Sequence, residues 1–288
     1  HKKGYTNLLT KERADLDLFS KEETQSFFKK NKPELVILAA GRVGGIIQNR
    51  DYPADFIFEN LAIQLNVLDA AYKSKTKRLI FFGSSCMYPR DTSQPMKENQ
   101  LYTGHPEPTS MAYASSKFAG IQMCHAINSQ CDSTSFISVI PNSVYGFNDN
   151  FDLQSSHVLS GLIKRIHEAK ITNSNAVTLW GTGSPKREFL YVDDLVEACV
   201  LILNSKIKNE ILPINIGVGS DISIKSLASM ISFIIGFKGE INWDTSKPDG
   251  APQKLLDNSN IKSLGWLPNE SLDGGIKKVY EWFLKNKI

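Results

Sequence analysis

Two groups of residues in this chain have the types and spacing needed for proton transfer. The stretch FFGSSCMYPR places Ser84, Ser85 and Cys86 where an apolar strand opens into a loop. In YASSK, Tyr113 and Lys117 are four residues apart and would share one face of a helix. An ammonium beside a phenol favours the phenolate, which lowers a pKa that is ordinarily about 10. The pair could thus exchange protons with a substrate oxygen, although Tyr and Lys are also common on helix surfaces.

Strands and helices alternate around these residues. We expect buried strands in PELVILAAG (33–41), KRLIFFGSS (77–85) and SFISVIPNSVYG (135–146), separated by helices over 52–74 and 110–130. This order is typical of βαβ units with a parallel sheet and right-handed crossovers. Ligands of such sheets bind at the carboxyl ends of the strands. The predicted fold class is therefore α/β, a Rossmann-like doubly wound parallel sheet.

The later half of the chain is less regular and predicts a smaller α/β lobe. A strand is expected at AVTLWG and another in LPINIGV, and REFLYVDDLVEACVLILNS should join a strand to a helix. Amphipathic patterns predict three further helices, at 155–170, 223–237 and 271–287. One strand–helix piece of this half is expected to return to the first lobe.

The composition of the 288 residues is ordinary for a globular protein and excludes several classes. Hydrophobic residues make up 41%, charged residues 22%, and the net charge is +3. This charge gives no reason to expect nucleic acid or a membrane as partner, and no apolar run reaches the length of a membrane span. The cysteines show neither C-x-x-C nor metal-ligand spacing. We therefore expect no metal, reduced thiols and a cytoplasmic location.

A series of motifs gives the chain a family resemblance. A strand-end Ser followed by Tyr-x-x-x-Lys on the next helix is similar to the short-chain dehydrogenase/reductase superfamily. The chain further resembles its GDP-L-fucose synthase family from about residue 6 to the C-terminus. The motifs that carry this resemblance, in order, are AAGRVGGI, YPADF, GSSCMYP, EPT, YASSKFAG, DNF with SSHV, WGTGSPKREFLYVDD, and KPDG with KLLD.

The resemblance implies an NADP(H)-dependent epimerase-reductase acting on GDP-4-keto-6-deoxy-D-mannose. The hydrogens at C3 and C5 of a 4-keto sugar are acidic, and Cys86 and His157 would exchange them. Tyr113 would then protonate the C4 oxygen while hydride reaches C4. Ser84 would hydrogen-bond that oxygen in both stages, and Lys117 would bind the nicotinamide ribose and tune Tyr113.

The resemblance also carries over binding residues. Arg165, Trp180, Arg187 and Asp257 match positions that hold the GDP moiety. The matching cofactor-binding positions are Lys11, Arg13, Ala39, Ala40, Phe82, Gly83, Ser84, Ser85, Lys117, Pro141, Asn142, Ser143, Val144 and His157. It further implies a homodimer through helices 54–74 and 111–130.

On this basis we divide the chain into two parts. Residues 1–146 are expected to form the dinucleotide-binding domain, to which 183–218 partly return. Residues 147–182 and 219–288 are expected to form the substrate-binding lobe.

The chain departs from the family pattern in two places, and a third segment, GRVGGI, needs care. No G-x-x-G-x-x-G turn precedes TNLLTKERADLDL, so we expect an N-terminally incomplete sequence with impaired cofactor binding. That segment resembles the second strand and its loop, where Lys11 and Arg13 suit a 2′-phosphate. We do not assign GRVGGI to a phosphate, because IIQNRDYP after it does not indicate a helix N-terminus. PNSVYGFNDNF differs from the family at Asn142, Ser143, Phe147 and Asn148, which makes the exact sugar less secure.

Several alternatives stay open at the level of sequence. Cys86 could be a small buried apolar residue, His157 a helix cap and Trp180 a core residue, while Lys11 and Arg13 could be solvated loop charges. A rival enzyme would act on another GDP-4-keto-deoxysugar, such as a colitose precursor. A more distant one would be an NAD-dependent 4-epimerase or dehydratase, which needs no Cys–His pair. A degenerate, non-catalytic member of the fold is the non-enzyme alternative.

Overall fold

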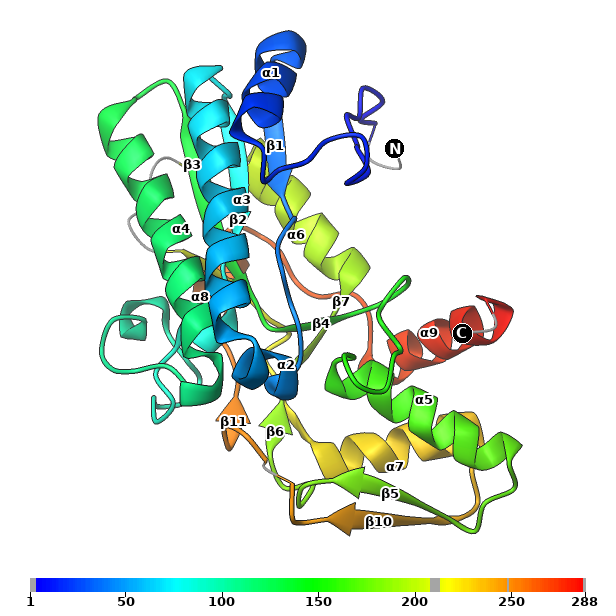
Figure 1. The fold of residues 1–288 in the computed structure, drawn as a ribbon. Coiled ribbons are helices and arrows are strands. Elements are labelled where there is room, and N and C mark those ends of the chain that lie inside the picture. The colour runs from blue at the N-terminus through cyan, green and yellow to red at the C-terminus, as the bar shows by residue number, and fades with distance from the viewer. Residues whose placement is uncertain (1–3, 208–212, 248, 287–288) are drawn as a thin grey trace.

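Four parallel strands form the central sheet of the protein (Figure 1). The computed structural model describes residues 4–207, 213–247 and 249–286. In it the strands follow the order β1-β2-β3-β8, and every pairing is parallel. The strands are β1 (Leu35–Leu38), β2 (Arg78–Phe82), β3 (Ser135–Pro141) and β8 (Ile214–Ile216). Leu212, within the expected LPINIGV strand, lies outside the described residues.

Helices cover both faces of this sheet because successive strand side chains point to opposite sides. Leu79 and Phe81 of β2 belong to a core shared with α3 and α4, whereas Ile80 between them packs with α6. Figure 1 shows α3 and α4 along one face and α6 on the other. The helices around the sheet are α1 (Lys21–Asn31), α3 (Pro53–Lys73), α4 (Met111–Gln130) and α6 (Val192–Asn204). The predicted doubly wound α/β class is confirmed.

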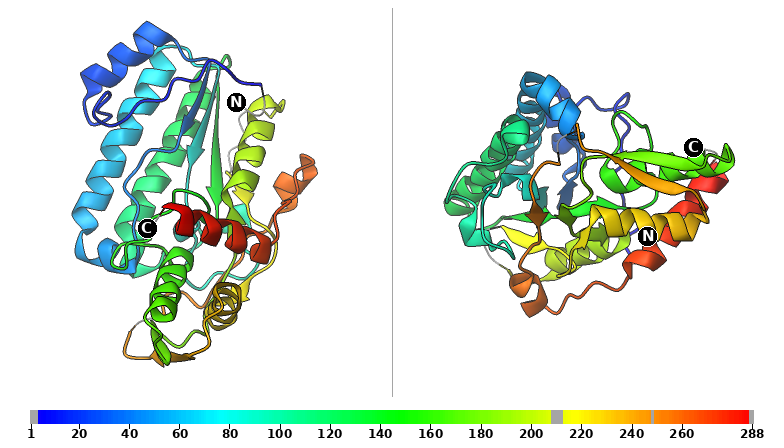
Figure 2. Two further views of the ribbon diagram at one scale, coloured as in Figure 1. Left: turned by 90° about the vertical axis from the view of Figure 1, so that its right-hand side faces the viewer. Right: turned by 90° about the horizontal axis from the view of Figure 1, so that it is seen from below.

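A smaller group of elements lies beyond the carboxyl ends of the strands, as both views of Figure 2 show. Its core joins three helices to a two-stranded parallel sheet, in which β10 pairs with β5. The elements are α5 (Val158–Ile171), β5 (Ala176–Trp180), α7 (Ile224–Ile235), β10 (Glu240–Asp244) and α9 (Leu272–Asn286). This matches the expected second α/β lobe. Lys287, the last residue of the expected terminal helix, lies outside the described residues.

Short strands connect the two groups. Strand β4 pairs with β7, and β6 lies between β11 and β9. Leu256 packs in the core of α3 and α4, and Ile261 and Trp266 pack in the core of α6. The segment after β11 therefore contacts the first lobe, although it falls within the expected 219–288 lobe; the other domain bounds stay a prediction. The connecting elements are β4 (Ser143–Tyr145), β6 (Lys186–Arg187), β7 (Phe189–Tyr191), β9 (Ile222–Ser223), β11 (Gln253–Lys254) and α8 (Ser259–Ser263).

Two local expectations were wrong. The TNLLT segment does not form a strand: residues 6–10 are exposed and pair with no strand of the described chain, and an isolated strand gains no ladder hydrogen bonds. A short helix, α2 (Ile46–Asp51), begins directly after GRVGG. The Asn49 amide closes this turn by donating to the carbonyls of Gly44 and Gly45, at 2.9 and 3.1 Å. Among the described residues, no helix is both long and apolar enough to cross a membrane.

Candidate active site

Cys86 lies at the carboxyl end of β2, in the 3-10 turn η1 (Ser85–Met87). Ser84 caps this turn, because its Oγ accepts a hydrogen bond from the Cys86 backbone N–H at 3.2 Å. On the other side, Lys254 Nζ donates to Cys86 Sγ at 3.3 Å. Lys254 and Cys86 both line a hollow between η1 and β11. The thiol is thus in polar contact with a cation, which argues against the alternative of an apolar packing residue.

The electrostatics at Cys86 favour the thiolate. Burial raises the pKa of the thiol, but the Lys254 ammonium and hydrogen bonds from Ser84, Lys254 and Ser110 act against burial. Their combined effect holds the pKa of Cys86 below its usual value. A thiolate is the form that accepts protons, so this cysteine is suited to act as a base.

Tyr113 and Lys117 lie one turn apart on α4, as the spacing predicts. The Tyr113 ring packs edge-on against Phe56, with the ring centroids 6.2 Å apart. Lys117 is only 6% exposed. Its Nζ lies 5.1 Å from the Phe81 ring centroid and 5.8 Å from that of Tyr113. Among the described residues, no ion pair or hydrogen bond engages this ammonium.

The pKa values of this pair differ from the sequence expectation. The pKa of Tyr113 is raised, first by burial of the phenol and then by the neighbouring Cys86, while a Ser84 hydrogen bond opposes the rise. Burial lowers the pKa of Lys117 to about 8. The expected lowering of the tyrosine pKa by Lys117 is therefore wrong for this structure, because desolvation disfavours both charged forms and outweighs their mutual attraction.

A buried hydrogen-bond network ties the η1 turn to the second lobe. Ser85 Oγ donates to Asn142 Oδ1 at 3.3 Å, and Asn142 Nδ2 donates to Glu188 Oε2 at 2.6 Å. Glu188 is 0% exposed and also accepts from the backbone N–H groups of Leu256 and Gly219. Asn142, one of the departures from the family pattern, is thus part of the link between the lobes.

The positions expected to bind cofactor fall into three sets. Ala39 and Ala40 are exposed at the carboxyl end of β1. Lys11 and Arg13 are exposed before α1, with the Arg13 guanidinium 5.1 Å from the Phe19 ring centroid. Apart from Lys117 on α4 and His157 before α5, the remaining residues lie at the carboxyl ends of β2 and β3, where Gly83 donates a backbone hydrogen bond to the Val139 carbonyl at 2.8 Å. Of these later positions, Phe82 and Val144 pack partly into the core of α6, and Pro141 and Ser143 are half-buried at the strand ends.

His157 is exposed at the N-terminal boundary of α5, and its side chain makes no capping hydrogen bond. His157 thus stands at the N-cap position, as the capping alternative expected, but its side chain does not satisfy a helix N–H group. Asp149 interacts electrostatically with the imidazole, and the pKa of Asp149 is raised because burial outweighs that attraction. The loop before α5 also approaches the GRVGG loop, since a Cβ on Gly45 would lie 3.6 Å from the Ser156 carbonyl oxygen.

Of the four expected GDP-binding residues, Arg165 on α5 and Trp180 on β5 lie on the second lobe, and Arg187 lies on the connecting strand β6. The Arg165 guanidinium stacks over Trp180 at 5.2 Å, and Lys247 Nζ lies 5.9 Å from the same ring. Trp180 is 46% exposed, so it is not a core residue. Arg187 on β6 is attracted to Cys86 and Asp249, although burial lowers its pKa.

Asp257 occupies a different environment. Its backbone N–H donates to the Met96 carbonyl at 2.8 Å, and its carboxylate accepts from Ser259. The Ser259 hydrogen bond is the main cause that lowers its pKa, with smaller contributions from Lys97 and Lys262. None of these contacts involves Arg165 or Trp180. The assignment of Asp257 to GDP binding therefore stays a prediction.

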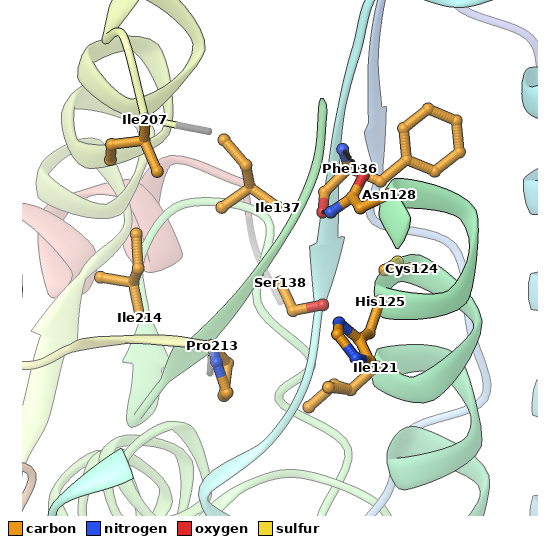
Figure 3. A pocket seen from close by; sticks show the side chains of 10 residues that line it. All are labelled: Ile121, Cys124, His125, Asn128, Phe136, Ile137, Ser138, Ile207, Pro213 and Ile214. Atoms are coloured by element: carbon orange, nitrogen blue, oxygen red, sulfur yellow. Dashed lines mark hydrogen bonds between the residues drawn. The ribbon is translucent and has the colours of Figure 1, made fainter. Parts of the chain in front are cut away.

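A second hollow lies away from these residues, between α4 and strands β3 and β8 (Figure 3). Cys124, His125 and Ser138 are among its lining, and burial raises the pKa of Cys124 to about 12. This thiol is therefore protonated at neutral pH and gives the hollow no reactive group. Within the described ranges no cluster of His, Cys, Asp or Glu could hold a metal ion.

Two residues of the site were not singled out from the sequence. Lys254 precedes Asp257 in KLLD, and Glu188 lies in REFLYV, so both stand inside motifs that carried the family resemblance. Their charge type gave no signal, because a lone Lys or Glu is ordinarily a surface residue. The only signal for burial was the apolar residue that follows each of them, Phe189 after Glu188 and Leu255 after Lys254.

Comparisons with known proteins agree with this geometry. Residues 2–217 match the NAD dependent epimerase/dehydratase family. A GDP-L-fucose synthase of Arabidopsis thaliana is 48% identical over 283 residues, which cover 98% of this chain and 87% of that protein. A GDP-L-colitose synthase of Yersinia pseudotuberculosis is 36% identical, with 97% and 90% covered. The structure of a GDP-mannoheptose C4 reductase from Campylobacter jejuni with NADP bound superposes with a TM-score of 0.88 at 37% identity, covering 98% of this chain and 91% of that one.

Proposed function

The chain belongs to the NAD-dependent epimerase/dehydratase family, and we propose that it converts GDP-4-keto-6-deoxy-D-mannose to GDP-L-fucose by 3,5-epimerisation and 4-keto reduction. The observation that carries this proposal is the contact of Cys86 with Lys254, 3.3 Å from thiol to ammonium, beside Ser84 and Tyr113. A plain ketoreductase needs the Ser–Tyr–Lys set only. Cys86 is a second proton-transfer group at the same strand end, and it allows protons bound to carbon to be exchanged as well.

Epimerisation uses the acidity of the carbons that flank the 4-keto group. Cys86 removes a proton from C3 or C5, and the electron pair moves onto the C4 oxygen as an enolate. Ser84 donates a hydrogen bond to that oxygen and stabilises its charge. His157, exposed on the opposite lobe, returns a proton to the other face of the ring. An imidazole titrates near neutral pH and suits this exchange.

Reduction uses the same C4 oxygen. NADPH is the cofactor and supplies hydride to C4. Tyr113 gives its proton to the oxygen, and the raised pKa of the phenol keeps that proton in place until the alkoxide forms. The phenol becomes a better acid when Lys117 is charged beside it, so the state of this ammonium links the two residues.

The residues present fit a nicotinamide dinucleotide. The Lys117 ammonium is buried, and no acceptor among the described residues satisfies it. Ribose hydroxyl oxygens are the acceptors that this position lacks. Ala39 and Ala40 leave the carboxyl end of β1 free of large side chains. The exposed Lys11 and Arg13 offer positive charge that suits the extra phosphate of NADP.

Arg165, Trp180 and Arg187 bind the GDP part of the substrate. The exposed Trp180 ring offers a stacking surface for the base or the ribose. Arg165 and Arg187 have the planar guanidinium that pairs bidentately with diphosphate oxygens. Lys247, which approaches the same ring, adds positive charge at this end of the site.

Two narrower points complete the proposal. The free thiols suit a cytoplasmic enzyme. A homodimer through α3 and α4 is supported by Phe58 and Leu65, which expose 69% and 56% of their surface on α3. Sedimentation of a Phe58→Asp, Leu65→Asp variant should then show a shift to monomer, and an unchanged dimer would remove this face from the interface.

The function is tested by running the reaction in deuterium oxide with NADPH and GDP-4-keto-6-deoxy-D-mannose. GDP-L-fucose should form with deuterium at C3 and C5. Cys86→Ser should lose that uptake while it still reduces a pre-epimerised intermediate, and Tyr113→Phe should show the reverse. Turnover of the 3-deoxy analogue in preference to this substrate would favour the colitose-type alternative, and no turnover of either would favour a non-catalytic member of the fold.

A further inference from the structure

Lys254 and Cys86 come from distant parts of the chain, 168 residues apart, and meet between the two lobes. Lys254 lies on β11 and Cys86 on η1, and Lys254 Nζ donates to the sulfur at 3.3 Å. Within the described parts of the chain, no carboxylate forms an ion pair with Lys254. The Cys86 thiol is therefore the group with which the Lys254 ammonium interacts.

Hydrogen bonds at the Lys254 carbonyl and at the next two residues fix its backbone. Asn142 Nδ2 donates to the Lys254 carbonyl at 3.2 Å, and the next N–H, that of Leu255, donates to Gln94 Oε1 at 2.8 Å. The N–H of Leu256 donates to the buried Glu188 carboxylate at 3.0 Å. With its backbone fixed, Lys254 directs its ammonium to Cys86 Sγ. The hydrogen bonds to Asn142 and Glu188 therefore help to position this ammonium.

The other charged groups around Cys86 do not replace this cation. Arg187 on β6, the register partner of Lys254, attracts the thiolate electrostatically but, among the described residues, makes no hydrogen bond to it. Arg90 lines the same hollow but is paired with Glu107, with Arg90 Nε and Glu107 Oε2 3.4 Å apart. Tyr113 on α4 faces the thiol as a neutral phenol, because its pKa is raised.

We propose that Lys254 is a positioning residue that holds Cys86 as a thiolate, ready to act as the base of the epimerisation. This inference rests on the proposed function for the role of the base. The thiolate takes the proton of the C–H bond and becomes a thiol, and the electron pair of that bond passes to the C4 oxygen. Lys254 keeps its own proton throughout, so it stabilises the reactant form of Cys86 without taking part in the transfer.

The first test measures the thiolate without any substrate. Alkylation of each cysteine by iodoacetamide is followed by peptide mass spectrometry as a function of pH, in the wild-type protein and in Lys254→Met. Removing the cation should raise the apparent pKa of Cys86 by at least about one unit, so the pH profile of its alkylation should move to higher pH by that amount. Lys254→Arg, which keeps the charge, should restore most of the wild-type profile.

Cys131 is the internal reference, since it is partly exposed and its hydrogen-bonded neighbour is Ser133 rather than a cation. Its pH profile should be the same in every variant, and Lys225→Met on the surface of α7 should leave Cys86 unchanged. An unaltered Cys86 profile in a folded Lys254→Met protein would overturn the proposal. A Cys86 pKa that rises in Lys254→Met but stays equally high in Lys254→Arg would also overturn it, because the change would then come from altered structure and not from the lost charge.

Deuterium uptake at C3 and C5 then tests the link to catalysis. In Lys254→Met the pH profile of uptake should move to higher pH by at least about one unit, so uptake at neutral pH is slower and regains rate as pH rises. The substitution should add no further loss in a Cys86→Ser background. Additive losses would place Lys254 outside the action of Cys86 and refute the proposal. Absence of uptake in the wild-type protein would refute the proposed function instead, while the alkylation profiles would still decide whether Lys254 holds the thiolate.

Discussion

Replacing Lys117 by methionine should make the fold more stable while it removes the reductase activity. Burial lowers the pKa of this ammonium from 10.5 to about 8. At about 1.4 kcal/mol per pKa unit, the buried charge costs about 3 kcal/mol of stability at neutral pH. The Phe81 and Tyr113 rings offset about 1 kcal/mol of this through cation–π attraction. Methionine fills a similar volume without charge, so the expected net gain is about 2 kcal/mol.

The gain should depend on pH with a definite sign. The native state releases the Lys117 proton near pH 8, whereas the unfolded chain keeps it to about pH 10.4. Between these values the unfolded state binds more protons, so the free energy of unfolding of the wild type rises with pH relative to the variant. The advantage of Lys117→Met should fall from about 2 kcal/mol at about pH 7 to about 1 kcal/mol at about pH 9. Urea unfolding followed by tryptophan fluorescence at both pH values measures it.

The same variant should lose NADPH oxidation, because methionine cannot donate to the ribose or assist Tyr113. Lys225→Met is the matched control, since it removes an exposed lysine on α7 and should change neither stability nor its pH dependence beyond about 0.5 kcal/mol. A Lys117→Met protein that is less stable than the wild type at neutral pH would refute the reasoning. So would a stability difference that does not change between the two pH values.

Three further predictions concern packing, the buried network and nucleotide binding. Gly120→Ala places a Cβ 2.1 Å from the Phe81 ring, so the urea midpoint should fall by the equivalent of about 1–3 kcal/mol despite the better helix propensity of alanine. Glu188→Ala leaves two buried donors, the Asn142 amide and the Leu256 backbone N–H, without their shared acceptor. At about 1–3 kcal/mol for each, the free energy of unfolding should fall by at least about 2 kcal/mol in the same assay. Arg165→Ala removes the cation stacked on Trp180 and should weaken GDP binding about tenfold or more, measured by calorimetry, with the unfolding midpoint unchanged.

The first two of these have a counterpart that isolates the cause. Gly274→Ala places its new Cβ against flexible Glu270 and Ser271 side chains and should cost much less than Gly120→Ala. Glu281→Ala removes an exposed carboxylate and should be neutral. An equal effect in either control, or a Gly120→Ala protein as stable as wild type, would contradict the packing argument. Unchanged GDP affinity in Arg165→Ala would remove this residue from the nucleotide site.

The sequence by itself determined the layers of the fold and the positions that bear chemistry. Hydrophobic runs and helical spacing are local patterns, and they sufficed for the four sheet strands and the long helices α3 and α4. The spacing of Tyr113 and Lys117 is also a local signal, because two residues four positions apart lie on the same face of a helix. Local signals were weaker where a turn decides the outcome, which is why the α2 helix after GRVGG was missed and a strand was expected in TNLLT.

The tertiary structure alone decided the electrostatics of the site. A pKa depends on burial and on neighbours that the chain brings from elsewhere. The spacing of Tyr113 and Lys117 suggested a lowered tyrosine pKa, but burial of the phenol and the neighbouring Cys86 raise it. Lys254 could not be placed beside Cys86 from the sequence, because their contact requires β11 to fold back onto the first lobe. The reactive residues are therefore set by sequence, and their protonation states by the packing of one lobe against the other.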